Sequence, residues 1–458
     1  MGERRNRGNT LRRHETMRAV SPAALRRDTA DASLTRIRRR PLRNTLDGFA
    51  ATQRTSIVSG SSAGKDRPLA KIKAHSLTGR ITPDLMWTAF RNVKRNRGAA
   101  GIDKVSIQMY ERNLMPNLEA LLRRLKNGTY QSQPLRRVHI PKGDGKTRPL
   151  GIPAVRDRVA QEVIRQLLSP LFERIFHDDS YGFRPKRGCH LAVERVIELQ
   201  RQGYTHVLDA DIKGFFDNIP HTVIMAGVAA EVADGNILRI VERFLKAGVM
   251  EEGRFRPTSV GTPQGGVISP LLANIALNGL DWQLHNAGFR HVRYADDFVV
   301  LCQSEAQVKE AHELVQQHLT TLGLTLSAEK TKVTRFREGF AFLGFAISSW
   351  SVTMRPKSVE KFKTKIRELT TRHHNLDQDV VKKVNQVVRG TANYFATSFS
   401  SVGDRFRGLD RWLRMRIRCM KFKHKRRSDN WRLQRKHLRH LGFVFLSECR
   451  APPAVETT

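Results

Sequence analysis

The sequence predicts an α+β protein that continues into an all-helical domain. Upstream of Arg355, short apolar strands alternate with amphipathic helices, without the strict strand–helix repeat of a doubly wound fold. Downstream of Arg355, strand signals nearly vanish and three helical segments that suit a small bundle follow, at 356–374, 378–398 and 404–427. These observations predict a mixed domain over residues 76–355 and a helical domain over 356–458.

Three helices are predicted in the mixed domain from apolar residues at helical spacing. Pro116 begins the first and Gly128 ends it, because Pro suits the first helical turn and Gly the position after the last. The second spans 156–176. Ser304 caps the third, and Gln307 three residues later is its expected capping-box partner.

Strands are predicted where short apolar runs are bounded by turn residues. Val138-His139-Ile140 begins a strand that turns at residues 143–145. Residues 207–212 form a second short strand. Two apolar runs surround an acidic pair within 291–302, which is the pattern of a hairpin.

The chain is strongly basic, with 81 Lys and Arg against 43 acidic residues and a formal net charge of +38. Such a balance draws a protein towards polyanions, so nucleic acid is the first partner to consider and a membrane surface the second. No stretch approaches the roughly 18 uninterrupted apolar residues of a spanning helix, and we expect no membrane partner. Residues 1–75 carry Arg clusters among small polar residues, which fits either a disordered basic arm that lies on RNA or a solvated tail without function.

The cysteines and the N-terminus favour the cytoplasm. The four cysteines are far apart and never form a Cys-x-x-Cys pair, so the sequence indicates reduced thiols and no sequence-local zinc site. No apolar signal-peptide core follows Met1. An Arg-rich, acid-poor beginning would also fit an organelle transit peptide, but we favour a cytoplasmic protein.

The helical domain ends in a very basic segment. Residues 411–439 contain thirteen Lys or Arg and one acid, Asp429, interleaved with Trp412, Phe422 and Trp431. Basic residues mixed with aromatics suit a nucleic-acid surface that combines phosphate contacts with base stacking. A solvated charged face is the alternative.

Three aspartates lie at the ends of apolar runs, where an ionised carboxylate needs compensation. Asp211 ends the apolar run that begins at Val207, and Asp296 and Asp297 lie between the two halves of the hairpin. Adjacent carboxylates repel, so a multivalent cation is the natural compensator, and hard oxygen ligands favour Mg²⁺. Spacing alone leaves open the simpler interpretation that Asp296-Asp297 makes a turn and Asp211 is a cap.

Several segments around these aspartates resemble the boxes of reverse transcriptases. Tyr294-Ala295-Asp296-Asp297 resembles their central box, and 211–219 resembles the box with the first catalytic aspartate. Between them, 261–275 is similar to the group II intron form of the nucleotide-pocket box. Further matching segments lie in family order at 96–103, 140–153, 180–185, 323–332, 342–345 and 390–395. The chain resembles the bacterial group II intron-encoded reverse transcriptase–maturases over about 80–450.

The resemblance implies a right-hand polymerase, with fingers and palm (an antiparallel sheet flanked by helices) and a helical-bundle thumb called domain X. It implies catalysis by Asp211, Asp296 and Asp297. Two Mg²⁺ ions, with Mn²⁺ as a substitute, would be held by these carboxylates and by the backbone carbonyl of Ile212. In a regular strand, Asp296 and Asp297 would point to opposite faces, so both can approach the ions only if a turn lies there.

The resemblance also implies a dNTP pocket formed by Lys142, Arg148, Gly214, Phe215, Phe216 and Gln264. Lys142 and Arg148 match the cations that clamp the triphosphate. Phe216 falls at the steric gate that would clash with a ribose 2′-hydroxyl, whereas Phe215 also fits an ordinary core position. Gln264 would contact the incoming nucleotide.

The implied function is an RNA-directed DNA polymerase that copies group II intron RNA from a DNA primer or target, using dNTPs. As a maturase, the chain would also bind the intron RNA to assist splicing and mobility. It resembles the kind without a C-terminal HNH endonuclease, because no cluster of paired cysteines and histidines follows the thumb. Two alternatives stay open: a splicing-only RNA-binding maturase, and a host-adopted enzyme of repair or defence.

Overall fold

The computed structural model of the 458-residue chain describes residues 73–143, 146–262 and 264–449. All of them belong to one compact unit, Ala70–Thr458. The predicted basic arm lies outside the described residues, apart from 73–75.

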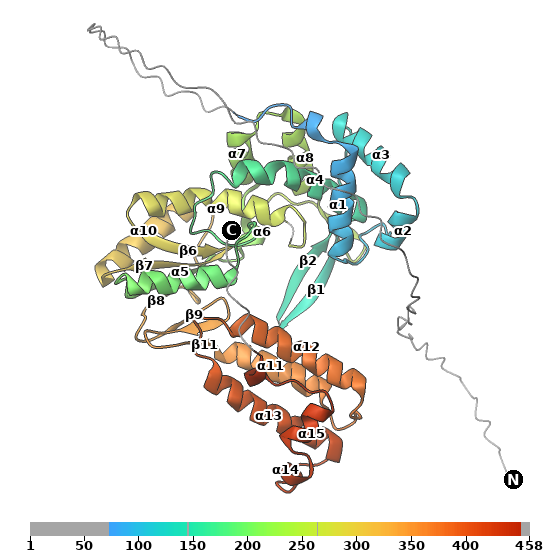
Figure 1. Ribbon diagram of the computed structural model, residues 1–458. Helices are drawn as coiled ribbons and strands as arrows, with labels where there is room; N and C mark the ends of the chain where they lie inside the picture. The colour runs from blue at the N-terminus through green and yellow to red at the C-terminus, as the bar shows by residue number, and fades with distance from the viewer. Residues whose placement is uncertain (1–72, 144–145, 263, 450–458) are drawn as a thin grey trace, which may run out of the picture. The chain divides into compact units, whose positions relative to one another are not determined.

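The first part of the unit combines helices with a sheet of strand order β2-β1-β4-β5. Its elements are a 3₁₀ turn (Thr78–Arg80), α1 (Pro83–Arg95), α2 (Ile107–Arg112), α3 (Leu114–Lys126), β1 (Leu135–Gly143), β2 (Lys146–Ile152), α4 (Val155–Phe172), α7 (His221–Glu231), α8 (Gly235–Leu245), β4 (Val249–Glu251) and β5 (Arg254–Arg256). Strands β1 and β2 form an antiparallel hairpin (Figure 1). Strand β1 also pairs with β4 in parallel. The long intervening chain allows this crossover.

The central sheet has the order β6-β7-β3-β8, and its pairs are antiparallel throughout. Its elements and neighbours are α5 (Cys189–Arg201), β3 (His206–Asp211), α6 (Phe215–Asn218), α9 (Ser269–Asn286), β6 (Arg290–Tyr294), β7 (Asp297–Cys302), α10 (Glu305–Thr321) and β8 (Lys332–Arg335). Leu208 and Val300 face the core that contains α9 and α10. Val207 and Leu301 face the core that contains α5, as side-chain alternation along a strand requires.

A small sheet of order β11-β10-β9 leads from the central sheet into a helical bundle (Figure 1). The elements are β9 (Phe340–Phe342), β10 (Phe345–Ile347), β11 (Val352–Met354), α11 (Pro356–Leu369), α12 (Gln378–Phe395), α13 (Gly403–Phe422), α14 (Asp429–Arg432), α15 (Arg435–His440) and a 3₁₀ turn (Leu446–Glu448). The described residues after Met354 contain no strand. The bundle shares one apolar core with α5 and one face of the central sheet, and the predicted α+β class with a helical end is confirmed.

The predicted helices form, with different ends. Helix α4 stops at Phe172, short of the predicted residue 176, where the chain tightens into a turn. Helix α13 stops at Phe422 because Lys423 adopts a left-handed conformation, with φ of 61°. The Ser304 cap is confirmed, but the Gln307 side chain accepts from the Gln303 amide, one residue before the expected donor.

Among the described residues, no helix combines the length and the apolar character needed to cross a membrane.

Gly101 packs directly against the start of α4, which explains why a glycine stands there. A Cβ atom at Gly101 would lie 2.5 Å from the Cα of Ala154, closer than real Cβ contacts. We predict that Gly101→Ala lowers the thermal unfolding midpoint, since overpacking of this kind costs about 1–3 kcal/mol. As the control, Gly390→Ala in α12 meets nothing within 4 Å and should raise the midpoint slightly. Equal midpoints for the two variants would contradict the assignment.

Candidate catalytic site

The ends of β3 and of the β6–β7 hairpin bring the three predicted aspartates together. Tyr294 pairs with Asp297, so Ala295 and Asp296 form a two-residue turn between the strands. Asp211 stands directly opposite Asp297 in the antiparallel pairing of β3 with β7. Directly opposite residues share a face of a sheet, so Asp211 and Asp297 lie side by side and Asp296 lies in the adjoining turn. The hairpin prediction is confirmed, including the turn on which an Asp297 ligand depends.

The turn has an uncommon backbone conformation. Ala295 has φ of 61°, in the left-handed region that costs a non-glycine residue about 1–2 kcal/mol. Of the two turn residues, Ala295 alone has a positive φ. Such a conformation persists only where the surrounding structure holds it.

The carboxyl groups of the hairpin are hard to ionise. Burial, followed by the charges of Asp209, Asp296 and Asp211, raises the pKa of Asp297 to about 7. Burial, together with the charge of Asp211, also raises the pKa of Asp296, against an opposing effect of Arg148. The nearby cations of the chain therefore do not fully compensate the negative charge that these carboxylates carry when all are ionised.

Asp209 is a fourth carboxylate of this site, which the sequence reasoning did not include. It lies two residues before Asp211 on β3, so both side chains share one face of the sheet. Burial, then the charge of Asp211, raises the pKa of Asp209 to about 6. Period-two alternation along Asp209-Ala210-Asp211 is the signal that would have found it.

Besides Arg148, three further cations, Lys330, Lys332 and Arg355, lie near these carboxylates. The Lys330 ammonium donates to Asp211 Oδ2 at 2.7 Å. Arg355, the residue that precedes α11, lowers the pKa of both Asp209 and Asp297, and its Nε is buried without a hydrogen-bond partner. Lys330, from the loop before β8, and Arg355, the residue before α11, therefore lie beside this group of carboxylates.

The chain beyond Asp211 is held by a neighbouring loop. The carbonyl oxygen of Asp211 accepts from the Ser327 amide at 2.8 Å, and the Lys213 amide donates to Thr325 O at 2.9 Å. Ile212 between them is buried. Gly214 then takes a φ of 56°, which lets α6 begin at once.

The two phenylalanines of α6 differ in exposure. Phe215 is 1% exposed and belongs to the core, whereas Phe216 is only partly buried. Their rings meet edge to face at 5.5 Å between centroids. A core position for Phe215 is therefore observed, and Phe216 keeps an accessible ring edge.

Hydrogen bonds connect the predicted nucleotide-binding residues on three elements. Gln264 Oε1 accepts from Arg148 Nε of β2 at 2.5 Å, and Gln264 Nε2 donates to Asp217 Oδ2 of α6 at 2.8 Å. The carbonyl oxygen of Gln264 accepts from the Gly151 amide at 2.8 Å. Gln264 thus links the β1–β2 hairpin to the segment after Asp211. The Lys142 side chain lies outside the described part of the chain.

The donors at the site fit a hard divalent cation. They are carboxylate oxygens in a cluster that repels itself, and such a cluster favours a multivalent ion. Among the described residues, however, no group of three carboxylate, imidazole or thiol side chains is placed to hold a metal by itself. An ion here would need further oxygen ligands from water and substrate phosphates, which Mg²⁺ normally retains.

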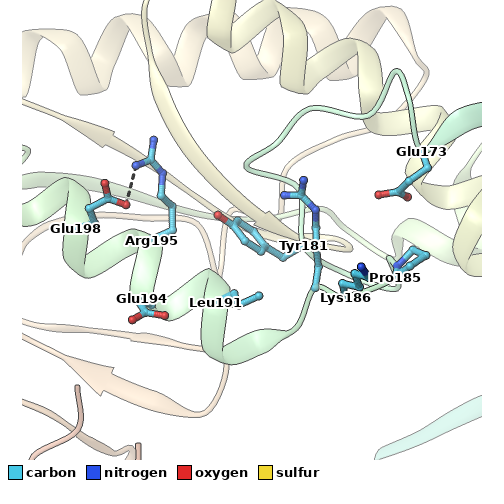
Figure 2. A pocket seen from close by; sticks show the side chains of 9 residues that line it. Glu173, Tyr181, Pro185, Lys186, Leu191, Glu194, Arg195 and Glu198 are labelled. Carbon is cyan, nitrogen blue, oxygen red and sulfur yellow. Dashed lines mark hydrogen bonds and ion pairs between the residues drawn. The ribbon is translucent and has the colours of Figure 1, made fainter. Parts of the chain in front are cut away.

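The aspartates do not line the hollow near α5. A hollow of about 600 Å³ lies between the loop before α5 and α5 itself, and Figure 2 shows its mixed-charge lining, including the Arg195–Glu198 ion pair. None of the predicted site residues lines this hollow. Asp211 and Asp297 instead lie at the ends of β3 and β7, the two inner strands of the central sheet, and Asp296 lies in the adjoining turn.

The basic segment of the bundle offers one freely exposed aromatic ring. Trp431 is 79% exposed, among the Lys and Arg residues of 423–435. Trp412 packs partly into the bundle core, and Phe422 lies under the Arg432 guanidinium, 4.4 Å from the ring centroid. Of the three aromatics in this segment, Trp431 is therefore the most exposed, and Trp412 and Phe422 are partly buried.

Sequence comparison places this chain among the template-directed nucleotide polymerases. Residues 140–347 match the reverse transcriptase (RNA-dependent DNA polymerase) family, and residues 359–437 match the group II intron, maturase-specific domain. The chain belongs to the group II intron-encoded reverse transcriptase–maturase family.

Individual relatives agree with this assignment. The chain is 36% identical to Protein YkfC of Escherichia coli over 303 residues, which are 57% of this chain and 80% of that protein. It is 30% identical to the group II intron-encoded protein LtrA of Lactococcus lactis over 339 residues, or 58% of this chain and 55% of LtrA. The chain therefore spans only about half the length of LtrA.

Solved structures give weaker likenesses. One is a partial Cas6-RT-Cas1–Cas2 complex, with a TM-score of 0.35, 24% identity, and coverage of 54% of this chain and 41% of that one. Another is the Candida albicans telomerase in complex with a telomeric RNA fragment, with a TM-score of 0.40, 14% identity, and coverage of 69% and 64%. The family assignment rests on the sequence matches.

Removing one like charge should stabilise the metal-free protein. In Asp209→Asn, we expect a thermal midpoint a few degrees higher at pH 8 in the presence of a chelator. The gain should shrink as the pH falls from 8 towards 4, because the folded wild-type carboxyl takes up its proton near pH 6, well above its ordinary value of 3.8. Asp404→Asn, whose side chain is 94% exposed, is the control and should change little. A pH-independent gain for Asp209→Asn would contradict the repulsion.

Proposed function

We propose that this chain is an RNA-directed DNA polymerase whose catalytic centre is the group Asp211, Asp296 and Asp297. The observation that carries the proposal is the direct pairing of Asp211 with Asp297, with Asp296 in the adjoining turn. The three carboxylates lie together at the ends of two neighbouring strands. Burial and repulsion among the carboxylates raise the pKa of Asp296 and Asp297, and such a group is suited to bind divalent cations.

In the proposed reaction, Asp211, Asp296 and Asp297 hold Mg²⁺ through carboxylate oxygens, and the Ile212 carbonyl adds a further ligand. Metal ions held by these residues would supply Lewis-acid chemistry for the attack of the primer 3′-hydroxyl and the departure of pyrophosphate. The pairing of β3 with β7 would keep Asp211 beside Asp297, and Lys330 would offset the charge of Asp211 before substrate binds. The primer 3′-oxygen bonds to the α-phosphorus, and the bond to pyrophosphate breaks.

The incoming nucleotide would lie between the aspartates and the β1–β2 hairpin. Arg148 affects the pKa of Asp296 and also donates to Gln264, so it can reach a triphosphate bound beside the metal ions. We assign Lys142 to the same clamp by resemblance. Phe216, with its accessible ring, serves as the gate against ribonucleotides, and Gly214 lets the chain turn sharply before it.

In this proposal the helical bundle binds the intron RNA. The maturase-specific match and the high positive charge support binding of group II intron RNA, through phosphate contacts and stacking on Trp431. In this proposal the template is intron RNA, the primer is DNA, and the protein works in the cytoplasm.

Loss of one ligand should abolish polymerisation and spare RNA binding. With a DNA primer on an RNA template and Mg²⁺, we expect Asp296→Ala to reduce dNTP incorporation at least about 100-fold. RNA affinity, measured by filter binding, should stay within error, because phosphate contacts come from other surfaces. Asp404→Asn is the control. If the wild-type chain incorporates no dNTP, the proposed polymerase activity is wrong, and a splicing-only maturase is favoured.

The gate assignment predicts a change in sugar selectivity. Phe216→Ala should reduce discrimination between dNTP and rNTP on the order of 10- to 100-fold, because the 2′-hydroxyl then meets open space. Competition between the two substrates in primer extension measures the ratio. Phe215→Leu, a core substitution beside it, should lower stability and leave the ratio unchanged. Unaltered selectivity in Phe216→Ala would show that the gate lies elsewhere.

A further inference from the structure

A fully buried arginine lies just before the catalytic hairpin turn. Arg293 of β6 is 0% exposed, and its guanidinium pairs in a bidentate way with Asp281 of α9, at 2.7 and 2.5 Å. Burial alone would raise the pKa of Asp281, but the charge and hydrogen bonds of Arg293 hold it below its ordinary value. The pair is therefore ionised in an apolar interior, at a desolvation cost that a hydrophobic pair of similar volume would avoid.

The third side of the guanidinium faces the turn. Arg293 Nη1 donates to Ala295 O at 3.0 Å and to Asn274 Oδ1 at 2.9 Å. Ala295 is the left-handed residue that leads into Asp296 and Asp297. The buried cation thus binds the carbonyl of the one strained residue in the turn, where its fixed planar geometry can set the peptide orientation.

Gly182 confines the same turn from another side. A Cβ atom on Gly182 would lie 2.4 Å from the amide nitrogen of Ala295, so only glycine fits against it. Asn274 Nδ2 donates to Gly182 O at 2.8 Å, which ties this glycine to the partner of Arg293. The backbone of Arg293 also bonds to Asp179 and Tyr181 on either side, at 2.9 and 2.8 Å. The turn is enclosed by a network that begins at Asp281.

We propose that Arg293 is a positioning residue for the polymerase reaction: through the Ala295 carbonyl it holds the turn that places Asp296 and Asp297 beside Asp211. Asp281 and Asn274 orient Arg293, and Gly182 lets the turn approach. The inference rests on the proposed function for its effect on catalysis, but the structural claim about the turn stands independently.

The test removes both charges at once, so that no uncompensated ion is left inside. Arg293→Met/Asp281→Leu keeps an apolar pair of similar volume and loses the bond to Ala295 O. We expect kcat for dNTP incorporation to fall at least about 100-fold, because small displacements of catalytic groups cost that much. KM for dNTP and the affinity for primer–template should change less than about threefold.

The control perturbs the same buried cluster without touching the turn. His291 is 1% exposed with its Nε2 3.4 Å from Asp281 Oδ1, and His291→Gln should keep kcat near the wild-type value. Hydrogen exchange of the segment 290–302 gives a readout that does not depend on activity. Protection of the turn amides should fall in the double variant and remain in His291→Gln, at similar unfolding midpoints.

The outcomes separate the two proposals. If the wild-type chain incorporates no dNTP, the proposed function fails, and hydrogen exchange still decides whether Arg293 holds the turn. If the double variant keeps both kcat and the protection of the turn, the positioning role is overturned. If the double variant does not fold, Asn274→Ala gives the same test, because it removes a support of Arg293 and leaves the Asp281 pair intact. It should then lower kcat and the turn protection together, and unchanged values would overturn the inference.

Discussion

Repulsion among carboxylates at the ends of the two inner strands of the central sheet constrains the rest of the structure. Asp209 and Asp211 share a face of β3, and Asp297 stands directly opposite Asp211. Lys330 and Arg355 offset part of this charge, yet the pKa of Asp297 still rises to about 7. The ionised carboxylates repel one another, so the surrounding structure must hold these side chains together.

The scaffold meets this demand with apolar packing below the carboxylates and a buried polar network beside them. On the opposite face of the same strands, Leu208, Ala210 and Val300 lie in a core with α9 and α10. Helix α9 also supplies Asp281 and Asn274, which hold Arg293 against the turn. One helix therefore both stabilises the sheet and sets the position of the turn, which couples folding to the geometry of the site.

Local patterns predicted most elements and placed Asp211, Asp296 and Asp297 at the ends of apolar runs, because strand alternation, caps and turn residues act over a few neighbours. Their catalytic role was predicted only from the resemblance to reverse transcriptases. The hairpin around Asp296 followed from two apolar runs and an acidic pair. The partners of Arg293 lie 12 and 19 residues away on another element, and only tertiary packing brings them to it. The partial burial of Trp412 and Phe422 depends likewise on the bundle core, which composition alone does not reveal.

The positive surface charge and the negative aspartates act in opposite ways on the phosphate groups of the proposed substrates. A chain of net charge +38 attracts phosphate backbones over much of its surface, while the aspartates repel them. In the proposed reaction, a primer end would approach these aspartates only when cations neutralise both partners, so metal binding and substrate binding should each strengthen the other. On that proposal the carboxylates need not form a closed metal site by themselves, because substrate phosphates would supply the remaining oxygen ligands.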